Sequence, residues 1–162
     1  MIFVTVGTDE HSFDRLVKKV DELIGSGLIK DEVVIQIGNT KYEPKNAKWF
    51  RFETYDKIKE LNKNSNLVIT HGGAGSIITA LMYGKRIIAV PRMKKYNEHV
   101  NDHQLELVRQ MEKESRIIGV YDIDNLYQAI VKSYKLKQTN SKTKLSDFLS
   151  EYLEKLEKHI KR

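Results

Sequence analysis

Short apolar runs alternate with helix-like patterns along residues 1–135, and this alternation limits the fold more than any other feature of the sequence. Six nearly unbroken apolar runs are typical of buried strands, and they are Ile2–Val6, Val33–Ile37, Trp49–Phe52, Leu67–Thr70, Ile87–Val90 and Ile117–Val120. Apolar residues recur at helical spacing in residues 13–24, 55–61, 76–83, 100–112 and 126–134. Strands that alternate with helices in this way predict a parallel sheet with right-handed crossovers.

Six strands in this arrangement predict a Rossmann-like, doubly wound α/β fold with the strand order 3-2-1-4-5-6. Ligands of such sheets bind beyond the carboxyl ends of the strands, where the strand order reverses. Gly7-Thr8 follows the first expected strand, and His71–Ser76 follows the fourth. We therefore expect these two segments to flank the binding crevice.

The 162-residue chain is expected to form one domain over residues 1–135, followed by a segment of a different kind. Residues 138–144 are polar and interrupt the pattern. Within residues 136–162 an amphipathic helix is expected, because one helical face carries Leu145, Phe148, Leu149, Tyr152, Leu153, Leu156 and Ile160. An isolated helix of this length is marginal in water, so this apolar stripe is expected to dock on its own domain or on a partner subunit.

The formal net charge is +6, and residues 135–162 contribute +4 of it, with eight Lys or Arg and four Asp or Glu. A basic segment can bind nucleic acid or an anionic membrane surface, or it can be the solvated face of a helix. Nucleic acid is not the expected partner, because the rest of the chain offers a better-defined anion site. The absence of cysteine, of a basic leader and of a long apolar stretch favours a cytoplasmic protein.

The most distinctive motif is Thr-His-Gly-Gly-Ala-Gly-Ser at residues 70–76, between an expected strand and an expected helix. Small residues let an anion approach the backbone, and the first N–H groups of the helix point at it. The helix terminus contributes about 0.3–2 kcal/mol, whereas a micromolar ligand needs about 8 kcal/mol. Further groups must therefore hold the rest of a nucleotide. The alternative is a glycine turn required only for tight packing of the helix on the sheet.

A second motif, Pro91-Arg92 and then residues 97–106, follows the fifth expected strand at the same edge of the sheet. It concentrates amide, carboxylate and imidazole groups, which bind sugar hydroxyls well because they donate and accept hydrogen bonds. The alternative is capping of the next helix by Asn101 or Asp102.

Taken in order, several motifs resemble glycosyltransferase family 28: Val4–Thr8, Phe13–Leu16, His71–Ser76, Gly84-Lys85, Val90–Arg92 and Asn101–Leu107. More narrowly, the chain is similar to donor-binding subunits of split transferases that act on lipid-linked sugars, in dolichol-oligosaccharide assembly or in bacterial exopolysaccharide and capsule synthesis. The resemblance implies the C-terminal half of a GT-B enzyme, which takes a UDP-sugar as substrate and requires no metal or other cofactor.

The resemblance also implies a membrane-anchored, acceptor-binding partner subunit and an inverting transfer to a lipid-linked sugar acceptor. Through that partner the chain would lie at the cytoplasmic face of the membrane. By position, Gly73–Ser76 would cradle the diphosphate, Asp102–Gln104 would meet the sugar hydroxyls, and Thr54-Tyr55 would border the uracil. The full set of expected donor-binding residues is Gly7, Thr8, Tyr55, His71, Gly72, Gly73, Ala74, Gly75, Ser76, Arg92, Asn101, Asp102, His103 and Gln104.

Glu10 and His11 are the candidate catalytic residues, because they follow the loop of the first expected strand and an inverting transfer needs a general base. They can also form the N-terminal turn of the first helix, and the base can lie on the partner subunit. Asp122-Ile123-Asp124 matches the Asp-x-Asp of metal-dependent transferases, but it directly precedes a helix, so helix capping is expected there and a metal site is not.

One position departs from the family pattern. Thr79 stands where full-length members often place a glutamate that holds both ribose hydroxyls. A single hydroxyl cannot accept two hydrogen bonds as a carboxylate does, so either another group holds the ribose or the nucleotide affinity is modest. A non-catalytic nucleotide-sugar-binding module is the alternative function.

Overall fold

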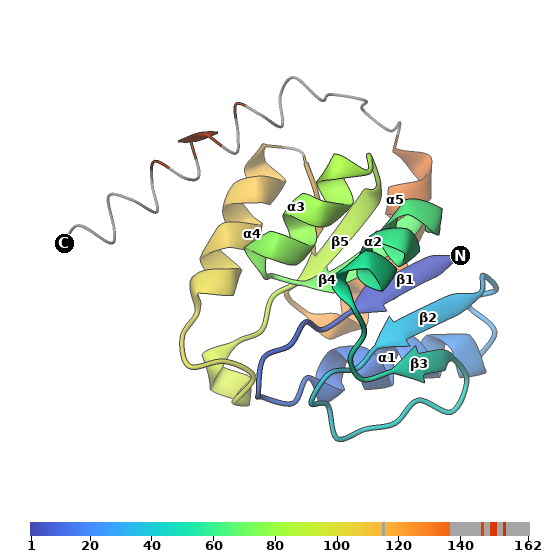
Figure 1. Cartoon of the computed structure of the whole chain (residues 1–162). Helices are drawn as coiled ribbons and strands as arrows, with labels where there is room; N and C mark the ends of the chain where they lie inside the picture. Colours follow the sequence, from blue (N-terminus) through green and yellow to red (C-terminus); the bar gives the residue numbers. More distant parts are fainter. Residues whose placement is uncertain (115, 137–146, 148–149, 152–153, 155–162) are drawn as a thin grey trace.

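Six parallel strands form one sheet in the order β3-β2-β1-β4-β5-β6, which confirms the predicted strand order. The computed structural model describes residues 1–114, 116–136, 147, 150, 151 and 154. Its strands are β1 (Ile2–Thr5), β2 (Val33–Gln36), β3 (Lys48–Phe50), β4 (Leu67–His71), β5 (Arg86–Val90) and β6 (Ile118–Gly119). The strand order reverses between β1 and β4, so the carboxyl ends of these two strands define the expected crevice (Figure 1).

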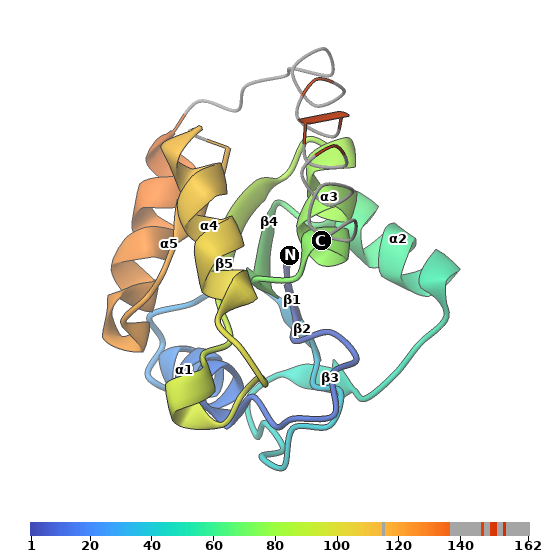
Figure 2. The same cartoon turned by 90° about the vertical axis from the view of Figure 1, so that its left-hand side faces the viewer.

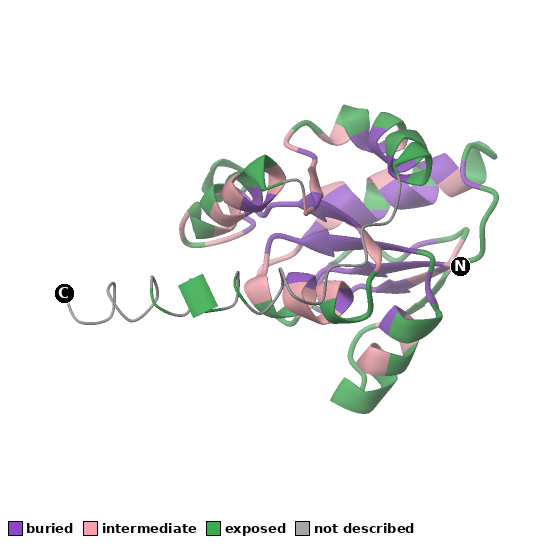
Figure 3. Cartoon of the chain, turned by 90° about the horizontal axis from the view of Figure 1, so that it is seen from above, coloured by how far each residue is buried: buried purple, intermediate pink, exposed green. Residues whose placement is uncertain are grey.

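Helices cover both faces of the sheet (Figure 2). On one face, α1 (Asp14–Gly25) and α5 (Leu126–Lys135) pack over a core that includes Val4, Ile35 and Leu16. On the other, α2 (Tyr55–Asn64), α3 (Ala74–Met82) and α4 (His103–Lys113) join a second core around Phe3 and Val68. Covered on both sides, the central strands are buried throughout, which accounts for their unbroken apolar sequences (Figure 3).

Several expected element boundaries differ from the observed ones, three of them by two or more residues near the sheet's carboxyl edge. Strand β3 ends at Phe50 instead of Phe52, α3 begins at Ala74 instead of Ser76, and α4 begins at His103 instead of residue 100. Helix α3 begins early because Gly73 serves as its N-cap in an extended conformation without a capping side chain. The expected amphipathic helix within residues 136–162 lies almost entirely outside the described residues, and the division at residue 135 stays a prediction. Within the described part of the chain, no helix is both long and apolar enough to cross a bilayer.

The connection between β2 and β3 is fixed to α1 by one buried carboxylate. Asp21, 2% exposed, accepts hydrogen bonds from the Tyr42 hydroxyl (2.6 Å) and from the backbone N–H groups of Lys45 (3.0 Å) and Asn46 (2.8 Å). Burial raises the pKa of Asp21, but these hydrogen bonds outweigh it and leave the pKa below its ordinary value of 3.8. The ionised carboxylate therefore stabilises the fold.

Replacing Asp21 by asparagine is expected to lower the free energy of unfolding by about 1–3 kcal/mol at neutral pH, because the amide nitrogen cannot accept these hydrogen bonds. Folding lowers the pKa of Asp21. The difference in free energy of unfolding between wild type and Asp21→Asn is therefore complete above pH 3.8 and decreases as the pH falls through the folded pKa. Urea unfolding of both proteins at several pH values measures this difference. The exposed control Asp31→Asn should change stability by less than about 0.5 kcal/mol, and equal stability of wild type and Asp21→Asn would refute the assignment.

Candidate functional site

The glycine-rich segment forms the junction of β4 with α3, as the sequence predicts. Strand β4 ends at His71, and the first hydrogen bond of α3 runs from the Ile77 N–H to the Gly73 carbonyl (3.2 Å). The N–H groups of the first turn therefore have no acceptor within the helix. Gly75, in that turn, is exposed, and a Cβ added there would meet nothing within 4 Å. This end of α3 can receive an anion from solvent.

The His71 ring lies between two glycines, one from each loop that flanks the expected crevice. A Cβ at Gly7 would come within 2.6 Å of the ring, and a Cβ at Gly73 would also overlap it. Gly7 in addition has a φ of +76°, which disfavours any other residue. Gly7 and Gly73 are therefore required by packing around His71, and Gly75 is not. The glycine turn thus serves packing at Gly72, where a Cβ would lie 2.8 Å from that of Gln104, and at Gly73, and it leaves open backbone at Gly75.

Burial keeps His71 neutral. Its side chain is nearly inaccessible to solvent, and desolvation, together with the positive charge of Arg92, lowers the pKa of His71 from 6.5 to about 4. A neutral ring allows the loops after β1 and β4 to pack against it without burying another charge.

Gln104 ties the two sequence motifs together. Its side-chain oxygen accepts a hydrogen bond from the backbone N–H of Gly72 (3.0 Å) and another from that of Arg92 (3.2 Å). Gly72 leads into α3 and Arg92 follows β5, so one oxygen atom fixes the loop after β4 to the loop after β5. The expected contact of Gln104 with a sugar stays a prediction.

The Arg92 guanidinium is fully buried and bonds to the protein's own backbone. It donates to the carbonyl oxygens of Val6 (2.8 Å), His11 (2.9 Å) and Glu98 (3.1 Å), and it stacks on the Phe13 ring at 4.8 Å. In this arrangement Arg92 joins the loop after β1 to the loop after β5. Its predicted contact with the donor is untested, and the structure gives its side chain a positioning role.

A second arginine, Arg15, joins α1 to the segment that follows β5. Arg15 on α1 forms two hydrogen bonds with the buried Glu98 carboxylate (2.8 and 2.9 Å), and Glu98 also accepts the backbone N–H of Met93 (3.1 Å). Arg15 donates as well to the Pro91 carbonyl (3.0 Å). The pair fixes the segment that carries the second motif. Sequence reasoning noted Arg15 and Glu98 as parts of motifs but did not pair them, since they are 83 residues apart.

Asp9 lies between two imidazole rings at the outer side of this edge. Its Oδ1 accepts the backbone N–H of His11 (2.8 Å) and contacts the His11 ring at Nδ1 (2.7 Å), while its Oδ2 is 3.6 Å from Nε2 of His99. Partial burial raises the pKa of Asp9, but the bonds from His11 and the charge of Arg92 outweigh it and lower the pKa below 3.8. Neither Asp9 nor His99 was singled out as catalytic from the sequence, where 90 residues separate them.

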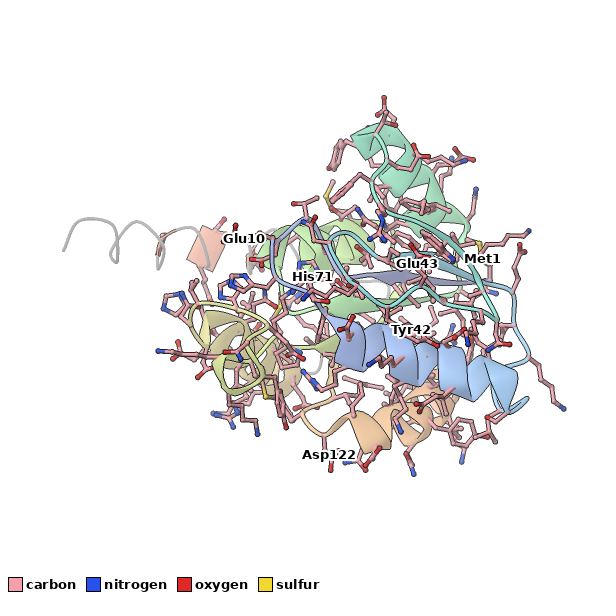
Figure 4. The ribbon with its side chains drawn as sticks, turned by 90° about the horizontal axis from the view of Figure 1, so that it is seen from below. Met1, Glu10, Tyr42, Glu43, His71 and Asp122 are labelled. Carbon is pink, nitrogen blue, oxygen red and sulfur yellow. The ribbon has the colours of Figure 1, made fainter. Side chains whose placement is uncertain are left out.

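The remaining predicted residues take different places. Thr8 and Glu10 are exposed on the loop after β1, and α1 begins only at Asp14, so the alternative that Glu10 and His11 form its first turn is wrong. Figure 4 shows Glu10 at the outside of this loop and His71 further in. Tyr55 is 65% exposed at the start of α2, beyond the edge strand β3, and does not share the Gly7–His71–Gly73 packing.

Helix α4 begins with the residues expected to meet the sugar. The side-chain oxygen of Asn101 accepts the backbone N–H of His103 (3.1 Å), and Asp102 accepts that of Lys94 (2.9 Å). Asp102 and His103 are exposed. Asn101 therefore acts as the expected local cap, while Asp102 is the N-cap residue by position and binds the preceding loop.

Comparison with known proteins decides the family. The family model of the glycosyltransferase family 28 C-terminal domain matches residues 1–161. The chain belongs to this family. It is 36% identical over 124 residues to the mouse protein "UDP-N-acetylglucosamine transferase subunit ALG13" and 35% identical over 125 residues to the human protein of the same name. These alignments cover 71% and 72% of this chain and 10% of each relative, so the chain spans about a tenth of their length.

A solved structure supports the fold of this family 28 domain. The glycotransferase of kitacinnamycin superimposes with a TM-score of 0.63 at 17% identity, over 98% of this chain and 39% of that chain. The predicted equivalence of this fold with one half of a GT-B enzyme is confirmed.

Two other expectations for the family 28 domain concern residues outside the glycine loop. The Thr79 hydroxyl donates to the Gly75 carbonyl of its own helix (2.8 Å), so its donor proton is already used. Asp122 is the N-cap of a short 3-10 helix, Ile123–Asn125, and accepts the Asp124 N–H (3.0 Å), which confirms the capping interpretation of Asp122-Ile123-Asp124. Among the described residues, no group of three or more His, Asp or Glu side chains has the geometry of a metal site.

The family 28 domain is expected to lose stability in weak acid through His71. Because the folded state lowers the pKa to about 4, the unfolded chain binds a proton first, and stability that is complete above pH 6.5 falls as the pH approaches 4. This group alone should account for about 3 kcal/mol of that loss. Urea unfolding between pH 7 and pH 4 measures the slope.

His71→Gln should remove most of this slope, whereas His103→Gln, at an exposed position, should retain it. An unchanged slope in His71→Gln would show that His71 is not held neutral in the folded protein.

Proposed function

We propose that this chain is the donor-binding subunit of a UDP-sugar-dependent glycosyltransferase that acts in glycan assembly. The observation that carries the proposal is the open first turn of α3, which offers backbone N–H groups at the point where the strand order reverses. Membership of family 28 and the name of the mouse and human relatives support UDP-N-acetylglucosamine as the first donor to test.

In this proposal the first turn of α3 binds the diphosphate of the donor. The reaction breaks the bond between the anomeric carbon and the diphosphate, and negative charge grows on the departing UDP. Oriented N–H groups at a helix N-terminus stabilise such charge without having to reorganise. The transfer would need no metal or other cofactor. Asp102 and His103, exposed at the start of α4, are proposed to contact the sugar hydroxyls, and Tyr55 the uracil.

The acceptor is proposed to bind on a second subunit. The fold matches 39% of a solved glycosyltransferase chain, and the curated relatives are named as subunits of a transferase. A membrane-anchored partner would present a lipid-linked sugar to the carboxyl edge of this sheet, from the cytoplasmic side, and transfer would invert the anomeric carbon. The apolar stripe predicted from the sequence within residues 136–162 is proposed to dock on the partner or on the domain itself.

The proposal is tested by titration calorimetry with UDP and UDP-N-acetylglucosamine, followed by transfer of radiolabelled sugar after co-expression with the membrane subunit. Binding with transfer would establish a catalytic subunit. Binding without transfer of any UDP-sugar would favour a nucleotide-sugar-binding module instead. Absence of heat with every uridine diphosphate compound would refute the proposal.

Gly75→Asp is expected to abolish UDP binding and to leave the fold intact. A side chain fits at this position, and a carboxylate in the first turn favours the helix but repels the diphosphate. Calorimetry should show at least a tenfold weaker Kd, which corresponds to about 1.4 kcal/mol, with an unchanged unfolding midpoint. Gly75→Ala is the matched control and should bind UDP. Tight binding by Gly75→Asp would place the diphosphate elsewhere.

A further inference from the structure

Asp9, His11 and His99 form a polar cluster on two loops of the carboxyl edge. Their side chains take no part in the packing around His71 or in the hydrogen bonds of Gln104. The loop after β1 carries Asp9 and His11, and the loop after β5 carries His99. The His11 and His99 rings are 6.4 Å apart between centroids. Their side chains are 28% and 19% exposed, and that of Asp9 is 28% exposed. The cluster is therefore accessible from solvent while its hydrogen bonds are in place.

The contact with Asp9 fixes the tautomer of His11. An ionised carboxylate can only accept hydrogen bonds, so the 2.7 Å contact requires a proton on Nδ1 of His11. In the neutral ring the lone pair then lies on Nε2. His11 thus presents a proton acceptor on the side of the ring away from Asp9.

The backbone of His11 is held on both sides. Its N–H donates to Asp9 Oδ1 (2.8 Å), and its carbonyl accepts the buried Arg92 guanidinium (2.9 Å). The Asn39 side chain in addition donates to the Asp9 carbonyl (2.9 Å). The His11 ring is consequently presented from a segment whose main chain is fixed, as a group that must meet a reacting atom requires.

The contacts of His99 support the same arrangement. The backbone N–H of Asn101 donates to Nδ1 of His99 (3.3 Å), so in the neutral ring the proton lies on Nε2. That atom is the one 3.6 Å from Asp9 Oδ2. The two oxygens of Asp9 therefore face one N–H group from each imidazole, and the lone pair of the neutral His11 ring lies on Nε2, the nitrogen that Asp9 does not contact.

We propose that Nε2 of His11 is the general base of the transfer, that Asp9 is its positioning residue, and that His99 orients Asp9. The inference rests on the proposed function and deepens it. It selects His11 over Glu10, which is exposed and which, among the residues that the structure describes, has no orienting partner comparable to Asp9. A base that keeps one tautomer and one orientation serves better than a carboxylate on a freely moving side chain.

The proton and electron balance of the step is complete without a further reactant. The acceptor hydroxyl forms the new bond to the anomeric carbon and gives its proton to Nε2 of His11. The electrons of the broken carbon–oxygen bond leave with UDP. The imidazolium is stabilised by the Asp9 carboxylate and afterwards returns the proton to solvent. The charged or titratable groups around His11 are Asp9 and Glu10 on its own loop, His99 opposite, and Arg92 beneath the loop.

The test measures sugar transfer by the complex of the full chain with its membrane subunit. His11→Gln is expected to lower kcat by about 10²- to 10⁴-fold, with unchanged KM for the UDP-sugar and unchanged Kd for UDP. Asp9→Asn should lower kcat strongly as well, because an amide can donate to Nδ1 and move the ring proton to Nε2. Asp31→Asn, at an exposed Asp before β2, is the matched control and should behave as wild type.

A spectroscopic measurement separates positioning from a merely structural role. The ¹⁵N shifts of the imidazole nitrogens distinguish the nitrogen that carries the proton from the one that carries the lone pair. The neutral His11 ring should carry its proton on Nδ1 in the wild type, and Asp9→Asn should shift the proton toward Nε2. The same tautomer in both proteins would overturn the role of Asp9.

Failure of this inference is distinct from failure of the proposed function. A wild-type complex that binds no UDP or transfers no sugar would refute the function and the inference together. Transfer at the wild-type rate by His11→Gln would refute the inference alone. Loss of transfer in Glu10→Gln with retention in His11→Gln would assign the base to Glu10.

Discussion

The buried guanidinium of Arg92 is the interaction on which the arrangement of the site depends. Three backbone carbonyls, from Val6, His11 and Glu98, bind one cation that has no access to solvent. Burying an arginine is costly unless its donors are used. The three carbonyls accept hydrogen bonds from its two terminal nitrogens, and these bonds keep the loops after β1 and β5 together over the end of the sheet. The imidazole cluster and the start of α4 lie on these loops, and Gln104 joins them to the loop after β4 that leads into α3.

The fold could be predicted because its signals are local and repeated. Apolar runs such as Leu67–Thr70 report burial on both faces, and their alternation with helices leaves few topologies. The glycine loop was predictable for the same reason, since strand, turn and helix are consecutive in the sequence. Element ends such as Phe50 and His103 were less accurate, because loop contacts decide them.

The interior of the site was not predictable to the same degree. Arg15 and Glu98 meet across 83 residues, and the Asp9–His99 contact spans 90. A single sequence does not indicate which charged residues, far apart in the chain, form ion pairs with each other. Arg92 was expected among the donor-binding residues, but its guanidinium is buried, stacks on the Phe13 ring and donates to the Val6 carbonyl. The sequence was sufficient to predict which residue types gather at this edge, whereas the role of each residue could be assigned only from the structure.

A single oxygen atom of Gln104 couples the loop after β4 to the loop after β5. A shift of the glycine loop after β4 would therefore also strain the loop after β5, which leads to α4. Altering donor choice by protein engineering would therefore fail at Gln104, where a substitution releases both loops at once. The practical route is the exposed face around His103, where side chains can be exchanged while the framework beneath them keeps its shape.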